Sequence, residues 1–158
     1  MELKTVYFEN PGRENTEAVL RIAKQRAEEL GINTILVAST KGNTAVRAMD
    51  VLQGLRVIIV THVTGFRTPD TQEFTEESRK IVEDKGGIIL TTAHAFAGLS
   101  RAMRHKYNMY VWGEVIADTL RIFGQGMKVA CETPLMAADS GLVSTDEDVI
   151  SIAGDSRG

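Results

Sequence analysis

The segment Ser39-Thr40-Lys41-Gly42-Asn43-Thr44-Ala45 has the residue types of a loop that binds phosphate. It follows an apolar run and opens a helical pattern, and free amides at a helix start, with the helix dipole, favour an anion. Gly42 lets the backbone turn and approach a ligand closely. Ser39, Thr40 and Thr44 offer hydroxyl groups, and Lys41 offers a charge. The same residue types also cap ordinary helices, and the GxxxxGK spacing of a P-loop is absent.

Two histidines follow other apolar runs and could reach the same place. His62 lies in Thr61-His62-Val63-Thr64-Gly65-Phe66-Arg67, and His94 ends Thr91-Thr92-Ala93-His94, close to Gly98. Histidine changes charge near neutral pH, so either side chain is a candidate acid or base, and Phe66 could stack on a planar ring. Ordinary loop hydrogen bonds and core packing explain these residues equally well.

Other ionisable side chains carry weaker signals. His105 lies in a basic run that is typical of a solvated helix face. Cys131 ends an apolar run, which favours a small buried core residue over a nucleophile. Glu132 and Asp139 could face a pocket mouth, but two carboxylates alone define no acid–base dyad. The three histidines are far apart and no HExxH or CxxC motif occurs, so we predict no metal site.

Composition narrows the class of protein. The chain has 158 residues, with 43% hydrophobic and 25% charged, which suits one ordinary globular domain. A net charge of -3 argues against nucleic acid or anionic membrane as the main partner. The single cysteine, the absence of a signal-peptide pattern and the lack of an apolar run of about 20 residues lead us to expect a cytoplasmic protein.

Short β-branched runs alternate with helical patterns, which predicts an α/β domain with a three-layer, mostly parallel, doubly wound sheet. We expect strands at residues 6–8, 34–38, 57–60, 88–90, 127–131 and 149–153. We expect helices at residues 16–30, 43–52, 95–106, 114–123 and 134–140, and a further helix that ends at Asp84. Asn15 is the expected N-cap of the first helix, Gly31 its stop, and Val19, Ala23, Ala27 and Leu30 its inner face.

Ligands of such sheets lie beyond the carboxyl ends of the strands. This rule directs attention to the loops after Ala38, Val60, Leu90, Cys131 and Ala153. The residues that we expect to bind the ligand are Ser39, Thr40, Lys41, Gly42, Asn43, Thr44, Thr61, His62, Gly65, Phe66, His94 and Gly98.

The 39–44 loop resembles the effector loop of the pyruvate kinase C-terminal domain, whose pattern is hydroxyl–x–Ser–Gly–x–hydroxyl–Ala. Ser39, Gly42, Thr44 and Ala45 match this pattern, whereas Lys41 stands where serine is usual. Asn43 stands where arginine is common. In that family the loop holds a sugar-phosphate effector, so the resemblance implies a phosphorylated ligand.

Nearly the whole chain resembles a family of stand-alone, largely archaeal pyruvate kinase C-terminal-domain-like proteins. The resemblance is carried by the segments at residues 7–16 (YFENPGRENT), 65–67 (GFR) and 136–142 (MAADSGL). It implies flavin mononucleotide (FMN) as the ligand, with its phosphate on the 39–44 loop, and it implies no settled activity. The family pattern continues where this chain ends at residues 154–158, so we expect either a truncated domain or a free tail.

Three functions remain open at this point. The first is an FMN-binding protein, and the second is a sensor or regulatory domain for a sugar phosphate or nucleotide. The third is an enzyme that acts on a phosphorylated substrate, with His62 and His94 as the catalytic candidates. The apolar stretch at residues 109–112 and the family analogy also suggest that the protein self-associates.

Overall fold

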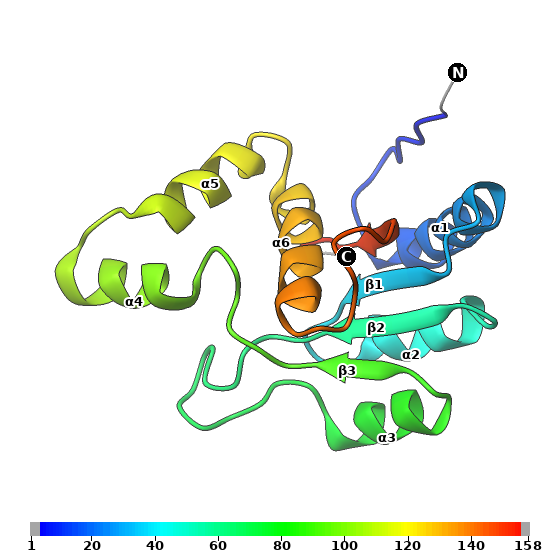
Figure 1. Ribbon diagram of the computed structural model, residues 1–158, viewed down its shortest axis with the longest axis horizontal. Coiled ribbons are helices and arrows are strands. Elements are labelled where there is room, and N and C mark those ends of the chain that lie inside the picture. Colours follow the sequence, from blue (N-terminus) through cyan, green and yellow to red (C-terminus); the bar gives the residue numbers. More distant parts are fainter. Residues whose placement is uncertain (1–3, 156–158) are drawn as a thin grey trace.

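A parallel sheet and seven helical segments make up the part of the chain that the computed structural model describes, residues 4–155 (Figure 1). The strands are β1 (Thr34–Ala38), β2 (Arg56–Val60), β3 (Ile88–Leu90) and β4 (Val149–Ile152). The helices are the 3₁₀ turn η1 (Arg13–Asn15), α1 (Thr16–Leu30), α2 (Asn43–Val51), α3 (Glu76–Asp84), α4 (Gly98–Tyr107), α5 (Trp112–Arg121) and α6 (Gln125–Asp139). Of the expected tail, residues 156–158 lie outside the described residues.

The strand order is β3-β2-β1-β4, and every neighbouring pair is parallel. The register places Val37 beside Ile59 of β2 and beside Ile152 of β4. Because all four strands run the same way, their carboxyl ends meet at one edge of the sheet. The predicted strands at residues 34–38 and 88–90 have the boundaries that the structure shows, and those at 57–60 and 149–153 differ by one residue at one end.

Helices cover both faces of the sheet, which confirms the predicted three-layer α/β architecture. Side chains alternate along β1, so Ile35 and Val37 pack with α1, α2 and α3, whereas Leu36 packs with α6 on the other face. These three strand residues are fully buried. Helix α6 lies across the face of the sheet that is nearer the viewer in Figure 1.

Helix α1 spans the predicted residues, but its start and its inner face differ from the expectation. Gly31 ends it in the left-handed conformation, with φ of 68°, as predicted. Asn15 makes no side-chain cap, because its amide instead donates to the carbonyl of Asn10 at 2.7 Å. Leu20 is fully buried, whereas Leu30, in the last turn of the helix, is 46% exposed.

Two predicted strands are wrong. Residues 6–8 form no strand, and their side chains are exposed. Residues 127–131 belong to α6, which also absorbs the short helix predicted at residues 134–140. One side of the helix packs on the sheet, and Lys128, Glu132 and Met136 are buried at a spacing of four residues. Pro134 lies inside this helix and does not end it.

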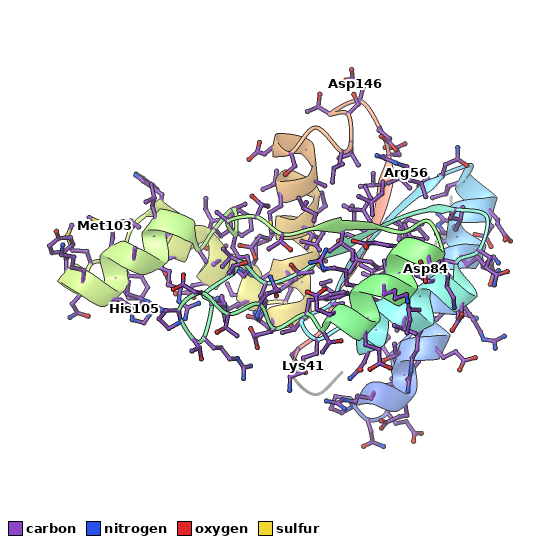
Figure 2. The ribbon with its side chains drawn as sticks, turned by 90° about the horizontal axis from the view of Figure 1, so that it is seen from below. Lys41, Arg56, Asp84, Met103, His105 and Asp146 are labelled. Atoms are coloured by element: carbon purple, nitrogen blue, oxygen red, sulfur yellow. The ribbon has the colours of Figure 1, made fainter. Side chains whose placement is uncertain are left out.

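Helices α4 and α5 form an arm that extends past the carboxyl ends of the strands (Figure 1). The labels of Met103 and His105 mark the arm in Figure 2, well separated from Lys41 on the body of the molecule. No residue of α4 is fully enclosed, and α5 buries only Glu114 and Ala117. Among residues 4–155, no helix is long and apolar enough to cross a membrane.

Candidate functional site

A large cleft opens at the carboxyl edge of the sheet. Its volume is about 1560 Å³, which exceeds the range of about 300–1,000 Å³ that is common for small-molecule pockets. The ends of β1, β2 and β4, the N-terminal residues from Val6 onward, the α4–α5 arm and one side of α6 line it. The cleft therefore lies where doubly wound sheets bind their ligands.

The 39–44 loop forms one wall of this cleft. Gly42 precedes α2 with φ of 106°, a backbone conformation that residues with a side chain adopt only with strain. Gly42 is also buried against Ser78. Ser39 Oγ accepts the amide hydrogen of Ala45 at 3.3 Å, while Val46 makes the first intrahelical bond, to the carbonyl of Gly42. The amide groups of Asn43 and Thr44 lie before this first bond and have no intrahelical acceptor, so they can donate hydrogen bonds to an anion.

Charge in the cleft is opposite in sign to the charge of the chain. Eight basic residues line it, namely Arg13, Lys41, Arg47, Arg67, Arg101, Arg104, Arg121 and Lys128. Four acidic residues do so, namely Glu77, Glu114, Glu132 and Asp155. A cationic cleft in a chain of net charge -3 concentrates small anions locally.

His62 is held in the cleft by two partners. Its Nδ1 lies 2.7 Å from Oε2 of Glu73, whose other oxygen pairs with Nε of Arg67 at 3.1 Å. Its Nε2 lies 3.4 Å from the hydroxyl oxygen of Thr40. The backbone is fixed as well, because the side-chain amide of Gln72 donates to the carbonyl of His62 at 3.0 Å. The carboxylate of Glu73, the imidazole of His62 and the hydroxyl of Thr40 are thus connected by consecutive contacts.

Phe66 packs among polar rings and cations. Its ring centroid lies 4.1 Å from that of His62 and 5.3 Å from that of His94. The guanidinium of Arg101 lies 4.0 Å from the Phe66 ring centroid and also donates to the Phe66 carbonyl at 3.1 Å. A flavin ring that stacked on Phe66 would have to replace one of these contacts.

His94 is the most perturbed titratable group of the cleft. Its pKa is lowered from 6.5 to about 4, chiefly by burial. The charge of Glu132 opposes this shift, and the charges of a protonated His62, Lys128 and Arg101 add to it. Its Nε2 accepts the amide hydrogen of Val63 at 3.3 Å. His94 is therefore a neutral imidazole at neutral pH.

Helix α6 contributes a buried ion pair to the same cleft. The ammonium group of Lys128 bonds to Oε2 of Glu132, and the two side chains are only 6% and 4% exposed. Oε1 of Glu132 also accepts the amide hydrogen of Phe96 at 2.9 Å. This pair joins α6 to the segment that follows β3, and it places a cation at the cleft wall.

The structure brings most of the predicted site residues together. Those that line the cleft are Ser39, Thr40, Lys41, Asn43, Thr44, Thr61, His62, Phe66 and His94. Gly42, Gly65 and Gly98 are not lining residues, although Gly42 shapes the loop. The hydroxyl of Thr61 is directed to Thr91 Oγ1 at 2.7 Å.

The remaining candidates have other positions. Glu132 lines the cleft, but as the partner of Lys128, whereas Asp139 is exposed at the end of α6. Cys131 is half-buried within α6, so no loop follows a strand there. His105 is an exposed residue of the arm that also lines the cleft, with its Nε2 3.4 Å from Nε of Arg101.

Sequence reasoning missed three groups that shape the site. Glu73 is 11 residues from His62 within a polar loop, and Arg101 is 35 residues from Phe66, so no local pattern marks either pair. Lys128 was assigned to a strand. The spacing of Lys128 and Glu132, four residues apart, is the signal that could have identified both the helix and the pair.

The fold and the site define a doubly wound α/β domain with a cleft that more basic than acidic residues line. The model of the pyruvate kinase alpha/beta domain matches residues 17–158, and the chain belongs to this family. Among solved structures, the chain is similar to a hydrogen sulfide-producing enzyme (Fn1220) from Fusobacterium nucleatum, with 12% identity and a TM-score of 0.34. That match covers 82% of this chain and 41% of the other, so the chain spans less than half of the length of that enzyme.

Proposed function

We propose that this protein binds a phosphorylated small molecule in the cleft, with the phosphate group on the 39–44 loop. The observation that carries the proposal is the excess of basic side chains around a helix start that offers the amides of Asn43 and Thr44. Thr40 and Thr44 add hydroxyl donors, and Lys41 adds a charge at the rim. Phosphate is one of the anions that such a combination commonly binds.

FMN is the first candidate ligand, on the strength of the family resemblance described above. The residues of the cleft fit its phosphate end. Tyr7 and Phe8 also line the cleft and are 89% and 40% exposed, so they supply aromatic surface for a flavin ring without disturbing Phe66. When bound, a flavin would supply redox chemistry and absorbance in the visible range.

A sugar phosphate or a nucleotide is the second candidate, in a sensor or regulatory role. The match of the 39–44 loop to the pyruvate kinase effector loop supports this alternative. The amide of Asn43 in place of the common arginine leaves room at the loop and lowers its charge. The single cysteine agrees with a reducing compartment, and on that ground we also infer a cytoplasmic location.

An absorbance scan of freshly purified protein, followed by mass spectrometry of what heat releases, separates the two candidates. Flavin bands and released FMN are the expected result for the first. If the protein is colourless and its Tm rises with sugar phosphates or nucleotides but not with FMN, the second candidate is the ligand. If no phosphorylated compound raises the Tm at millimolar concentration, the proposed function is wrong.

A further inference from the structure

Two histidines line the cleft, and their rings have different hydrogen-bond partners. The ring centroids of His62 and His94 lie 5.4 Å apart in an edge-on arrangement, and both residues line the cleft beside the 39–44 loop. Each has one ring nitrogen committed to a fixed partner. The other nitrogen of each ring therefore has a defined protonation state.

His62 is arranged as a base. The carboxylate of Glu73 can only accept a hydrogen bond, so the contact at 2.7 Å assigns the proton of the neutral ring to Nδ1. Nε2 then carries the lone pair, and it faces the hydroxyl of Thr40 at 3.4 Å. The lone pair thus lies at the edge of the loop that we propose for the phosphate. Glu73 also stabilises the imidazolium that forms when Nε2 takes a proton.

His94 is arranged as a hydrogen-bond donor. Its Nε2 accepts from the backbone of Val63, so the proton of the ring lies on Nδ1. Burial keeps this ring neutral, as the lowered pKa indicates. A neutral imidazole next to a base is a known arrangement for polarising a carbonyl oxygen while the base removes a neighbouring proton. The charge of Arg101, which also acts on His94, favours the negative charge that develops on that oxygen, whereas the charge of Lys128 is paired with Glu132.

We propose that the cleft is an active site for reversible proton abstraction next to the carbonyl group of a phosphorylated substrate. His62 is the base, His94 donates a hydrogen bond to the carbonyl oxygen, and Glu73 is a positioning residue. The inference rests on the phosphate-binding part of the proposed function and not on the flavin.

The step is balanced within the substrate and His62. The C–H bond next to the carbonyl breaks, and its proton forms an N–H bond at Nε2 of His62. The electron pair moves into a carbon–carbon double bond, and the carbonyl π pair moves to the oxygen that His94 contacts. Return of the proton to carbon restores the free base, so no oxidant, reductant or second substrate is needed.

Exchange of substrate hydrogen with heavy water tests this proposal. Dihydroxyacetone phosphate serves as the probe, because it combines a phosphate with C–H bonds next to a carbonyl. Proton NMR in heavy water should show protein-dependent loss of these C–H signals, and unphosphorylated dihydroxyacetone should exchange far more slowly. His62→Gln should lower the exchange rate about 100-fold or more. Glu83→Gln is the control and should leave the rate unchanged, because Glu83 is 54% exposed on α3 and does not line the cleft.

Two further measurements separate catalysis from structure. Nitrogen NMR of the His62 ring should show the proton on Nδ1 in the native protein and a mixture of tautomers in Glu73→Gln, with the exchange rate lowered as well. Calorimetric titration with inorganic phosphate reports on the loop alone. Phosphate binding without any exchange overturns this inference and leaves the proposed function standing, whereas absence of both overturns both. Equal exchange in the native protein and His62→Gln also overturns it.

Discussion

A Cβ atom placed on Gly42 would lie 2.2 Å from both Cβ and Oγ of Ser78, so the 39–44 loop packs directly on the first turn of α3. The positive φ of Gly42 and this contact act together, because the left-handed turn brings the loop backbone against the helix. Thr75 caps the same helix, with its Oγ1 accepting the Ser78 amide hydrogen at 3.2 Å. The loop can therefore take this position only because residue 42 is a glycine.

Gly42→Ala should distort the loop and destabilise the protein. Left-handed strain and overpacking together should cost about 3 kcal/mol in the free energy of unfolding, measured with urea. Gly31→Ala is the matched control, because its φ is 68° and a Cβ there meets nothing within 4 Å. That variant should lose about 1 kcal/mol and retain ligand binding. Equal losses in the two variants would show that the contact with Ser78 is unimportant.

The buried ion pair of α6 should be sensitive to the loss of one partner. Glu132→Gln keeps an acceptor for the Phe96 amide but leaves the charge of Lys128 buried without compensation, so unfolding free energy should fall by about 3–5 kcal/mol. The double variant Lys128→Met with Glu132→Gln removes both charges and should recover most of the lost unfolding free energy.

An exposed pair provides the comparison for this experiment. Glu83 pairs with Arg79 at 3.3 Å and its side chain is 54% exposed. Glu83→Gln should change stability by less than about 0.5 kcal/mol. If Glu132→Gln is as mild as Glu83→Gln, the pair on α6 is not buried in solution.

Stability should fall on acidification because of His94. Its pKa is about 4 in the folded protein and 6.5 when exposed, so the unfolded chain binds more protons between these values. The contribution of neutral His94 is fully present above pH 6.5 and is lost progressively as the pH falls toward 4. His94→Gln should remove this component, and His105→Gln should not. Urea unfolding of the three proteins at several pH values between 7 and 4 measures the difference, and parallel curves for native and His94→Gln would contradict the assignment.

Self-association remains a prediction, and the arm now supplies a candidate surface. Trp112, Ile122 and Phe123 are 84%, 78% and 74% exposed on and beside α5. Such an apolar surface is typical of an interface. We expect light scattering to give a mass at least twice 17.3 kDa, and Trp112→Glu with Phe123→Glu to give a monomer.

Leu30→Glu is the control for this surface, because Leu30 is 46% exposed on α1, away from the arm. It should leave the larger mass unchanged. A monomeric mass for the native protein would refute the prediction.

Local patterns predicted the elements that pack by local rules. Four consecutive β-branched residues predicted β2, and the hydroxyl side chains and Gly42 predicted the loop before α2. Helix α6 was missed because its apolar residues near 129–131 resemble a strand and Pro134 resembles a helix start. Tertiary packing on the sheet decides that segment, which also explains why a lysine and a glutamate are buried there.

The pairing within the site depends on contacts between distant segments. Both histidines were located from their places after strands, yet the partners that define their roles, Glu73 and the Val63 amide, lie on other parts of the chain. A long polar loop after β2 carries His62 and Glu73 back toward each other. No periodicity in the sequence predicts such a return.

We propose that the 39–44 loop recognises a phosphate group. Calorimetric titration with three matched pairs tests it most directly: FMN against riboflavin, fructose bisphosphate against fructose, and AMP against adenosine. We predict that at least one phosphorylated compound binds, that its unphosphorylated partner binds at least tenfold more weakly, and that Gly42→Ala abolishes the difference. Equal affinity within every pair, or binding of none of the six compounds, would show that the loop does not recognise phosphate.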